Sequence, residues 1–429
     1  MNRQMAAASS LLVAIMVAAV ALWSITSDTT VPVTTETTVG STAGSPEEPP
    51  TESPTQTLSP GTPASGAAPA TSSSPTAVPT SPPTSAPIAP DPLSASPPFA
   101  LAVYDTAWDI PFFATMAEID VYLDHLAATG YSGAWMSLIG FSGRRNGQLT
   151  PSPDLGVPQA TIGDDGSLLA TQENLSKMSA ILDAAGQRGL RIGIVATWGQ
   201  HWLNGDGDNC FANSSQIGNG PLQASNAEAL GRQIGEHFAG HPAIAFWVLG
   251  GDNYCQQSVG DASEDPAIWR NYAVGLRAGG ANHAMTYHSP HSPGAGLRPA
   301  HTWMMNEDWV DFLSPQTGHC VSDSMAQEQL AALIAVTDKP VVASEPRYET
   351  VPGVANFCGA TVGPAEIGAD ARAAISSGAA AILFGHHARF SWGADDGSGT
   401  VRPASSEIAL GTLGSPGERA LFENLSANN

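Results

Sequence analysis

Basic side chains are scarce in this sequence, and the shortage argues against one class of partner. The 429 residues include 16 Lys and Arg against 39 Asp and Glu, which gives a formal net charge of −23 at pH 7. A surface of this sign repels polyanions, so we expect no nucleic-acid partner. An excess of acidic residues is instead typical of a surface that keeps an exported protein soluble.

The motifs of several common enzyme classes are missing as well. The chain holds no Gly-x-Ser-x-Gly nucleophile elbow, no phosphate-binding loop and no dinucleotide fingerprint. No Cys-x-x-Cys and no His-Glu-x-x-His occurs, so the spacing of candidate ligands gives a metal site no support. We therefore expect no cofactor and no metal ion, and we look for chemistry carried by side chains alone.

The longest apolar run lies near the N-terminus. Arg3 precedes the run LLVAIMVAAVALW, which has the order of charge and apolar residues found in signal peptides. Together with the small residues before it, the run is long enough to span a bilayer as a helix. Residues 1–27 are therefore predicted to be a signal peptide or an uncleaved membrane anchor. Either one makes the protein exported, as a secreted protein or at the outer face of the cell membrane.

Residues 28–96 have few large apolar side chains and are rich in Thr, Ser, Pro and Ala. Such a composition buries too little apolar surface to offset its chain entropy. This segment is predicted to be a disordered linker that holds the rest of the chain away from a membrane or cell wall. One large domain, residues 97–429, remains.

Short apolar runs rich in β-formers alternate with longer helical segments from residue 97 onward, as in βα units. The helical segments include MAEIDVYLDHLAATG, NLSKMSAILDAAGQRG and SNAEALGRQIGEHFAG. Eight such units favour an α/β fold of the (β/α)₈ TIM-barrel type, although a doubly wound sheet gives a similar alternation. The runs expected to be strands cover residues 99–104, 133–139, 191–197, 243–249, 284–288, 310–315, 340–344 and 380–385.

Two carboxylates directly follow strands of this predicted barrel. Asp252 comes after AFWVLGG and Glu345 comes after PVVAS. Glycosidic cleavage commonly needs two carboxyl groups, one to protonate the departing oxygen and one to attack the anomeric carbon or activate water. Because strands four and seven lie across the mouth of a barrel from one another, these residues can flank a bound sugar. We expect Asp252 and Glu345 to be the catalytic pair.

Aromatic side chains follow the same strands. Sugar rings stack on aromatic planes, while their hydroxyl groups need dense hydrogen bonding. Trp108, Trp198 and Trp392 are the candidates for stacking, although tryptophan at a barrel rim equally serves packing.

Six short motifs at the strand ends resemble one known family, the apiosidase-like catalytic domains. These are (β/α)₈ glycoside hydrolases related to a large retaining clan, which carries its acid/base after strand four and its nucleophile after strand seven. The resemblance spans roughly residues 99–393. The motifs are Asp105-Thr-Ala-Trp108, Thr197-Trp-Gly199, Trp247-Val-Leu-Gly-Gly-Asp252, Met285-Thr-Tyr-His288, Gln316-Thr-Gly-His319 and Glu345-Pro-Arg-Tyr-Glu349.

The resemblance implies roles for individual residues. Asp252 matches the family's acid/base aspartate, and Glu345 matches its catalytic glutamate. It also implies activity on side-chain sugars of complex polysaccharides, with a terminal apiofuranose as the type substrate. The residues that would line the sugar subsite are Asp105, His288, Gln316, His319 and Tyr348.

Together these observations predict a retaining glycoside hydrolase, with Glu345 as nucleophile and Asp252 as acid/base. Its partner is a polysaccharide or oligosaccharide substrate, and the oligomeric state stays open. One alternative is a carbohydrate-binding barrel without catalysis. Another is a different hydrolase or lyase on the same fold, since a fold does not fix its chemistry.

The four cysteines all lie in the predicted barrel, and an even number in an exported chain favours disulfides. The loops after strands three and four are neighbours in a barrel, as are the loops after strands six and seven. A disulfide requires Cα atoms within about 7 Å. We therefore predict the pairs Cys210–Cys255 and Cys320–Cys358.

Deleting residues 1–96 should leave the melting temperature of the protein nearly unchanged, because the linker contributes no apolar periodicity to a core. Thermal unfolding of the full chain and of the truncated chain provides the measurement. A loss of more than a few degrees, or insolubility of the shorter chain, would show that the linker packs on the barrel.

Overall fold

In a computed structural model of the chain, all described residues belong to one compact unit, residues 83–429. The described residues are 93, 101–140, 144–145, 148–149, 159–198, 221–251, 266–289, 303–318, 321–352, 359–390 and 406–428.

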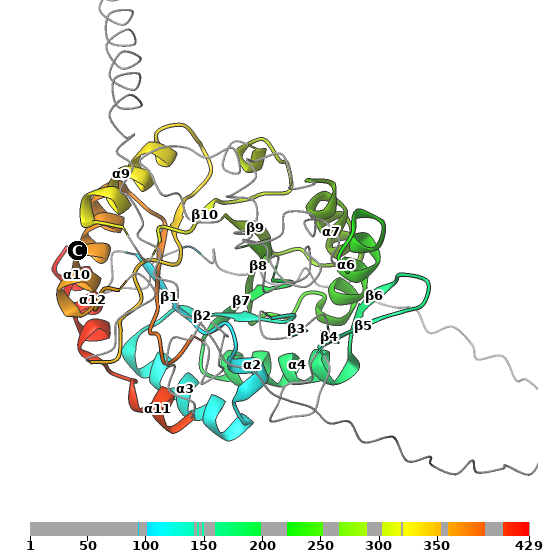
Figure 1. The fold of residues 1–429 in the computed structure, drawn as a ribbon, viewed down its shortest axis with the longest axis horizontal. Helices are drawn as coiled ribbons and strands as arrows, with labels where there is room; N and C mark the ends of the chain where they lie inside the picture. Colours follow the sequence, from blue (N-terminus) through cyan, green and yellow to red (C-terminus); the bar gives the residue numbers. More distant parts are fainter. Residues whose placement is uncertain are drawn as a thin grey trace, which may run out of the picture. The chain divides into compact units, whose positions relative to one another are not determined.

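Eight parallel strands form a (β/α)₈ barrel, which confirms the predicted fold class (Figure 1). The sheet runs in the order β10-β9-β8-β7-β2-β1-β12-β11, and parallel bridges from Leu313 to Val341 and from Gln316 to Ser344 join its two ends. Each predicted apolar run overlaps one strand. The strands are β1 (Ala102–Thr106), β2 (Gly133–Ser137), β7 (Arg191–Val195), β8 (Ile244–Gly251), β9 (Ala284–Ser289), β10 (Ser314–Pro315), β11 (Val342–Ala343) and β12 (Ala381–Phe384).

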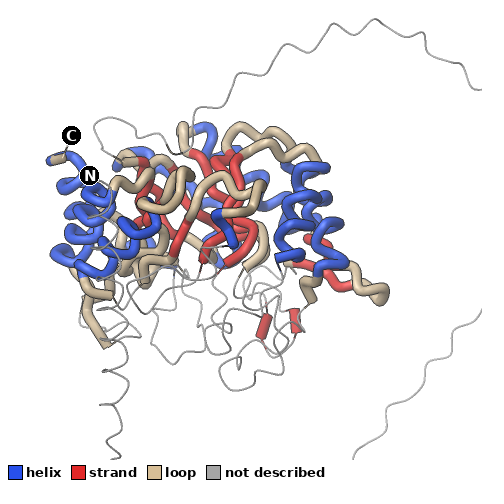
Figure 2. Tube along the Cα trace, turned by 90° about the horizontal axis from the view of Figure 1, so that it is seen from above, coloured by secondary structure: helices blue, strands red, loops and turns tan. Residues whose placement is uncertain are grey.

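Helices surround the strands, and Figure 2 shows the strands in the middle with helices on both sides. Local sequence sets their ends: Thr115 and Glu118 form a capping box at the start of α3, and Gly130 ends that helix at φ +96°. The helices are α2 (Ile110–Phe113), α3 (Met116–Thr129), α4 (Gln172–Gln187), α6 (Ala224–Phe238), α7 (Pro266–Ala278), α9 (Asp323–Ile334), α10 (Pro364–Ser377), α11 (Ser406–Gly411) and α12 (Pro416–Ala427).

Two small hairpins between β2 and α4 were not expected from the sequence. They pair β3 (Arg144–Arg145) with β4 (Gln148–Leu149), and β5 (Ala160–Ile162) with β6 (Leu168–Ala170). Both are antiparallel and stand apart from the barrel sheet. Strands of two or three residues carry too little period-two pattern to be recognised in a sequence.

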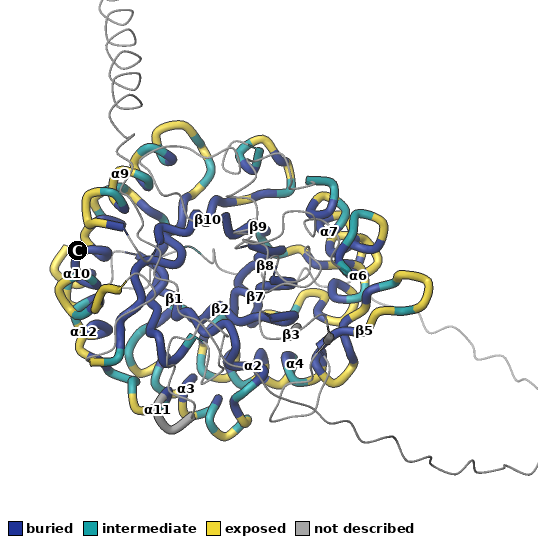
Figure 3. The backbone as a smooth tube through the Cα atoms, viewed as in Figure 1, coloured by how far each residue is buried: buried dark blue, intermediate teal, exposed yellow. Residues whose placement is uncertain are grey.

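The barrel strands separate two apolar cores. Along β1, Ala102 and Tyr104 join the cluster inside the barrel, whereas Val103 joins the cluster between strands and helices. Both faces of such a strand are buried, so its sequence reads as a continuous apolar run rather than an alternating one. Figure 3 shows the result, with the buried barrel strands at the centre and exposed residues on the outer parts of the helices and loops and on the hairpin of β5 and β6.

A buried ionic cluster ties α12 to the ends of β1 and β12. The Arg389 guanidinium donates to Glu418 on α12 at 2.9 Å and lies 3.4 Å from Asp105, while Tyr122 on α3 donates to Asp105 at 2.6 Å. One guanidinium thus serves two buried carboxylates. Burial raises the pKa of Asp105 to about 6, and the charge of Arg389 only partly offsets this effect. For Glu418 burial also acts upward, but the hydrogen bond with His125 and the charge of Arg389 lower its pKa to about 2.

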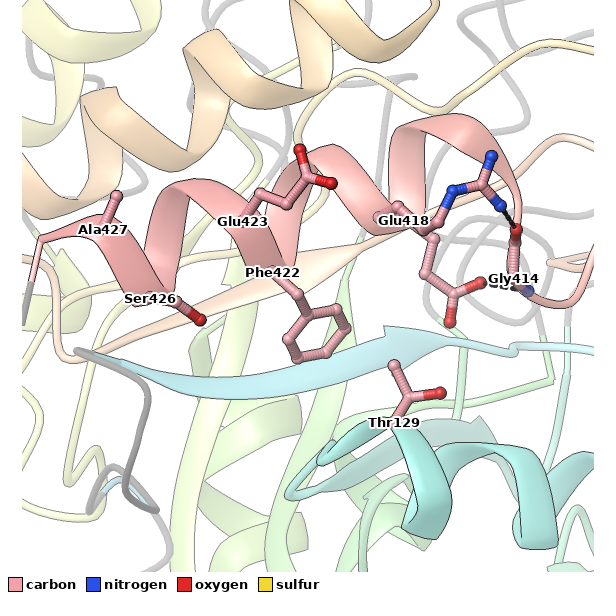
Figure 4. Close-up of a pocket in the computed structure, with 8 residues that line it drawn as sticks. Thr129, Gly414, Glu418, Phe422, Glu423, Ser426 and Ala427 are labelled. Carbon is pink, nitrogen blue, oxygen red and sulfur yellow. Dashed lines mark hydrogen bonds between the residues drawn. The ribbon is translucent and has the colours of Figure 1, made fainter.

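A groove of about 670 Å³ lies beside this cluster, where the end of α3 faces α12. Figure 4 shows Phe422 and Thr129 on facing sides of it. No residue predicted for the active site lines this groove, so it is separate from the strand ends that carry the motifs. Its lining consists of Thr129, Gly414, Glu418, Arg419, Phe422, Glu423, Ser426 and Ala427.

The N-terminal predictions fall almost wholly outside the described residues. Leu93 is the exception within 1–96, and it packs against the cluster inside the barrel. A truncation that begins after residue 92 keeps this contact, whereas one that begins after residue 96 removes it. Among the described residues, no helix is both long enough and apolar enough to cross a membrane.

The variant Asp105→Asn tests whether Arg389, which contacts both Asp105 and Glu418, leaves the pKa of Asp105 raised. The pKa of Asp105 is about 6 in the fold against an ordinary 3.8, so the folded chain keeps this proton after the unfolded chain has lost it. The group's contribution to the free energy of unfolding therefore falls as the pH rises from about 4 to about 6, by up to about 3 kcal/mol. Subtracting the variant's unfolding profile from the wild-type profile should isolate this slope.

The matched control is Asp124→Asn. Asp124 lies on α3 like Tyr122, but its carboxylate is largely exposed and contacts Arg188 rather than Arg389. This variant leaves the cluster around Arg389 intact, so its difference profile should lack the fall expected for Asp105→Asn. A flat difference profile for Asp105→Asn as well would mean that Arg389 keeps Asp105 ionised throughout.

Candidate active site

Glu345 lies at the centre of a buried polar cluster just beyond β11. Its side chain is almost fully buried, and its backbone has φ +48°, the one described non-glycine residue in the left-handed region. Neighbouring backbone groups hold this conformation, since Gly318 N–H donates to the Glu345 carbonyl at 3.1 Å and Thr317 N–H donates to the Ser344 carbonyl at 3.0 Å. Strained backbone held in place by its surroundings is frequent at functional sites.

Among the described residues, side chains from neighbouring strands contact the Glu345 carboxylate. Tyr348 donates its hydroxyl to Oε1 at 2.8 Å, and Gln316 donates its amide to Oε2 at 2.6 Å. His288 Nε2 lies 2.8 Å from the same Oε2. These partners come from β9, the end of β10 and the segment after β11, so three neighbouring strands converge on one carboxylate.

Tyr348 is a neutral donor to this carboxylate. Burial and the adjacent charge of Glu345 raise the pKa of Tyr348 well above its usual range. Trp108, after β1, donates its indole N–H to the Tyr348 oxygen at 3.1 Å. A chain of hydrogen-bond donors therefore runs from Trp108 through Tyr348 to Glu345.

Aromatic rings form the floor beneath Glu345. The His288 ring centroid lies 6.0 Å from those of Trp108 and Trp198, and 6.1 Å from that of Trp135. Trp108 and Trp198 pack directly on one another, with ring centroids 4.8 Å apart. All three indoles are nearly fully buried. They therefore support the polar cluster from inside the barrel.

Trp135 belongs to this site, and the sequence reasoning missed it. It lies within β2 rather than at the strand's end, where functional residues were sought. The alternation of side chains along a strand is the signal that could have found it. Ala134 and Met136 face the helices, so Trp135 between them faces the inside of the barrel.

The segment that begins with Glu345 is anchored at two further points. Arg347 contacts Asp370 on α10 at 2.8 Å and Asp323 on α9 at 2.7 Å. The Glu349 carboxylate accepts hydrogen bonds from Ser415 Oγ and, at 2.9 Å, from Gly417 N–H, at the start of α12. An acidic group at a helix N-terminus is favourable, so three helices fix the segment that carries Glu345.

The end of β8 approaches the same cluster from the other side. A Cβ atom at Gly250 would lie 2.1 Å from the Trp269 ring, and one at Gly251 would lie 2.5 Å from His288 Cβ. Gly251 also pairs with His288 in the sheet. The two glycines thus admit Trp269 and His288, and the residue that comes next in the sequence is Asp252.

The structure brings together six of the residues predicted for the site: Glu345, Trp108, Trp198, His288, Gln316 and Tyr348. His288, Gln316 and Tyr348, expected to bind sugar, contact the Glu345 carboxylate itself. Asp252, His319, Trp392 and the four cysteines, Cys210, Cys255, Cys320 and Cys358, lie outside the described residues.

Asp105 is a predicted site residue that the structure describes but that does not contact the cluster around Glu345. It occupies the outward-facing parity of β1, shared with Val103, and its carboxylate contacts Tyr122 and Arg389. This position, buried against the helices, argues against the predicted contact with a sugar.

Histidines at the strand ends do not form a metal site among the residues that the structure places. Within the described part of the chain, no group of three or more His, Cys, Asp or Glu side chains is arranged to hold a metal ion. His386, after β12, has its pKa lowered to about 3 by burial and then by the nearby Arg389 and His387. Its Nδ1 accepts a hydrogen bond from Ala388 N–H at 3.0 Å, which fits a neutral ring.

Comparisons with known proteins point to one family. A family model for the catalytic domain of apiosidase-like proteins matches residues 94–408. A solved glycoside hydrolase is 22% identical, with a TM-score of 0.57 over 76% of this chain and 69% of that protein. A glycoside hydrolase of family 5 from Bacteroides vulgatus is 21% identical, with a TM-score of 0.54 over 74% of this chain and 64% of that protein. A search of curated proteins found no match.

The strain at Glu345 is measurable by comparing Glu345→Gly with Glu345→Ala. Both variants lose the carboxylate, but only alanine keeps a Cβ atom in the left-handed conformation at φ +48°. The glycine variant should therefore be more stable than the alanine variant by about 1 kcal/mol. Denaturant unfolding of both variants provides the measurement. Equal stabilities would indicate that the backbone relaxes away from this conformation once the side chain is shortened.

Proposed function

Since this chain belongs to the apiosidase-like catalytic domain family of glycoside hydrolases, we propose that it is an exported retaining enzyme that cleaves a glycosidic bond in a complex polysaccharide. Glu345 is the nucleophile and Asp252 is the acid/base. The observation that carries the proposal is the environment of Glu345. Its buried carboxylate contacts Tyr348, Gln316 and His288 at the mouth of the barrel.

The reaction proceeds in two steps. In the first, Asp252 gives its proton to the departing glycosidic oxygen while a Glu345 oxygen attacks the anomeric carbon, and the bond to the leaving group breaks. In the second, the Asp252 carboxylate removes a proton from water, the water oxygen attacks the same carbon, and the ester bond to Glu345 breaks. Both residues then regain their starting protonation states.

The contacts on Glu345 suit a nucleophile better than a proton donor. The Gln316 amide nitrogen can only donate a hydrogen to one carboxylate oxygen, and the Tyr348 hydroxyl donates to the other. Donors that are fixed before the reaction orient an attacking oxygen at no cost during the step itself. The left-handed backbone at Glu345 adds a second constraint on its direction.

The assignment of Asp252 rests on its place in the chain. It directly follows Gly251, which pairs with His288 in the sheet, and His288 contacts Glu345. A retaining pair requires carboxyl groups about 5 to 5.5 Å apart. Side chains that extend towards each other from strand ends on opposite sides of a barrel mouth can reach this distance.

For the substrate, the family suggests a side-chain sugar of a complex polysaccharide, with a furanoside such as terminal apiose as the leading candidate. The N-terminal residues support export, because a positively charged start and an apolar run precede a linker rich in Ser, Thr and Pro. The enzyme would then meet polysaccharides outside the cell, secreted or held at the outer face of the membrane.

Replacing each carboxylate should separate the two roles. Glu345→Gln should abolish turnover of every substrate, whereas Asp252→Asn should slow natural substrates by about 10² to 10⁴ and spare substrates whose leaving group needs no proton. Sugar release measured by chromatography and the anomeric configuration of the first product by NMR provide the readouts. Glu328→Gln, an exposed carboxylate on α9, is the matched control and should keep wild-type rates.

Inversion at the anomeric carbon would contradict the retaining mechanism. Near-normal turnover by Glu345→Gln would contradict the role of Glu345. A wild-type protein that binds oligosaccharides but releases no sugar from any of them would favour a carbohydrate-binding barrel.

A further inference from the structure

The hydrogen atoms around His288 can be counted, because the ring is fully buried and both nitrogens have a close partner. Nδ1 lies 3.1 Å from Ser344 Oγ, and Nε2 lies 2.8 Å from Glu345 Oε2. A neutral imidazole carries one N–H hydrogen and an imidazolium carries two. The partners on each side therefore decide which form fits.

On the Nδ1 side, Ser344 allows only one arrangement. Ser344 Oγ lies 2.7 Å from the Pro315 carbonyl oxygen, which can only accept a hydrogen bond. The single hydroxyl hydrogen of Ser344 is used in that bond. Ser344 Oγ must then accept from His288, so Nδ1 carries a hydrogen.

On the Nε2 side, Glu345 asks for a second hydrogen. An ionised Oε2 can only accept, and it already accepts from Gln316 at 2.6 Å. A contact of 2.8 Å between Nε2 and this oxygen requires a hydrogen between them. With Nδ1 already protonated, and with Glu345 ionised, the state that the proposed function requires of it, this hydrogen belongs to Nε2 and the ring is an imidazolium.

The neighbour of the ring that favours a cation is the Glu345 carboxylate, because burial by itself disfavours a charged imidazole. Three indole rings lie around His288 with centroids 6.0 to 6.1 Å away, and they keep the contact between His288 and Glu345 out of water. Among the described residues, Glu345 is the carboxylate that contacts the His288 ring. Gly251 packs against the Cβ atom of His288. An ionised Glu345 and an imidazolium in contact with it each offset part of the other's cost of burial.

We propose that Ser344 fixes His288 as an imidazolium beneath Glu345, and that this cation promotes the second step of the reaction. Ser344 is a positioning residue, since it acts through His288. When Glu345 forms its ester, the carboxylate charge disappears and the imidazolium remains. As the ester bond breaks, negative charge returns to the Glu345 oxygen, and the imidazolium stabilises it as a leaving group. The kinetic part of this proposal rests on Glu345 being the nucleophile of the proposed function, and the protonation of His288 rests on Glu345 being ionised.

The protonation is tested directly by long-range ¹H–¹⁵N NMR of the full-length protein labelled at histidine, at pH 7. The spectrum distinguishes an imidazolium from either neutral tautomer, and the signal missing in His288→Gln identifies the residue. We expect wild-type His288 to be an imidazolium. A neutral ring in the wild type, in either tautomer, would overturn the proposal without the use of any variant that could fail to fold.

Two serine variants test the part played by Ser344. In Ser344→Ala the acceptor for the Nδ1 hydrogen is gone, so His288 should shift towards the neutral form that donates from Nε2. Ser289→Ala is the matched control, because Ser289 is a buried serine beside His288 whose hydroxyl has no partner among the described residues. It should leave the His288 signal unchanged. An unchanged imidazolium in Ser344→Ala would show that Ser344 does not set the protonation.

Kinetics test the role of the cation. With an activated leaving group, His288→Gln should keep a rapid first step, seen as a burst of released leaving group, and lose roughly tenfold in the steady-state rate. Equal slowing of both steps would overturn the assignment to the second step. If Glu345→Gln stays active while wild-type His288 is an imidazolium, the proposed function fails and the protonation stands. If Glu345→Gln is inactive and His288 is neutral, only the present inference fails.

Discussion

A carboxylate removed from water must receive from the protein the hydrogen bonds that water would have given it, and this requirement shapes the centre of the barrel. Glu345 takes its donors from Tyr348, Gln316 and His288, and each of two donors is in turn fixed by a further partner. Trp108 holds Tyr348, and Ser344 holds His288. The strained backbone at Glu345 persists because so many contacts determine it at once.

The same requirement explains the second buried cluster. Arg389 stands between Asp105 and Glu418, and it compensates the two unequally because Glu418 also receives Gly414 N–H at 2.9 Å and a hydrogen bond with His125 at 2.7 Å. Asp105 therefore shows the raised pKa and Glu418 the lowered one. The two clusters lie at neighbouring strand ends, but their carboxylates differ in their partners: Glu345 is held by side chains at the barrel mouth, whereas Glu418 attaches a helix.

The sequence was sufficient to predict the barrel and to single out Glu345 at its mouth. Continuous apolar runs marked the strands because both faces of each strand are buried, and Glu345 was found because it directly follows one of them. Asp105 follows the same rule and yet faces outward, because a side chain's direction at a strand end depends on its parity relative to residues such as Tyr104. Trp135 was missed for the converse reason, being inward by parity but within a strand. The donors to Glu345 could be named from their motifs, but only distances reveal that they contact the carboxylate.

The attachment of α12 has a consequence for how the protein is made. Glu349, in the segment that carries Glu345, finds its partners in Ser415 and Gly417, and Arg389 finds one in Glu418. A nascent chain that has not yet presented this helix leaves both side chains without those partners, in positions that the finished fold buries. These contacts at the strand ends can form only when synthesis has passed residue 418, so the surroundings of Glu345 are among the last parts of the described fold to be completed.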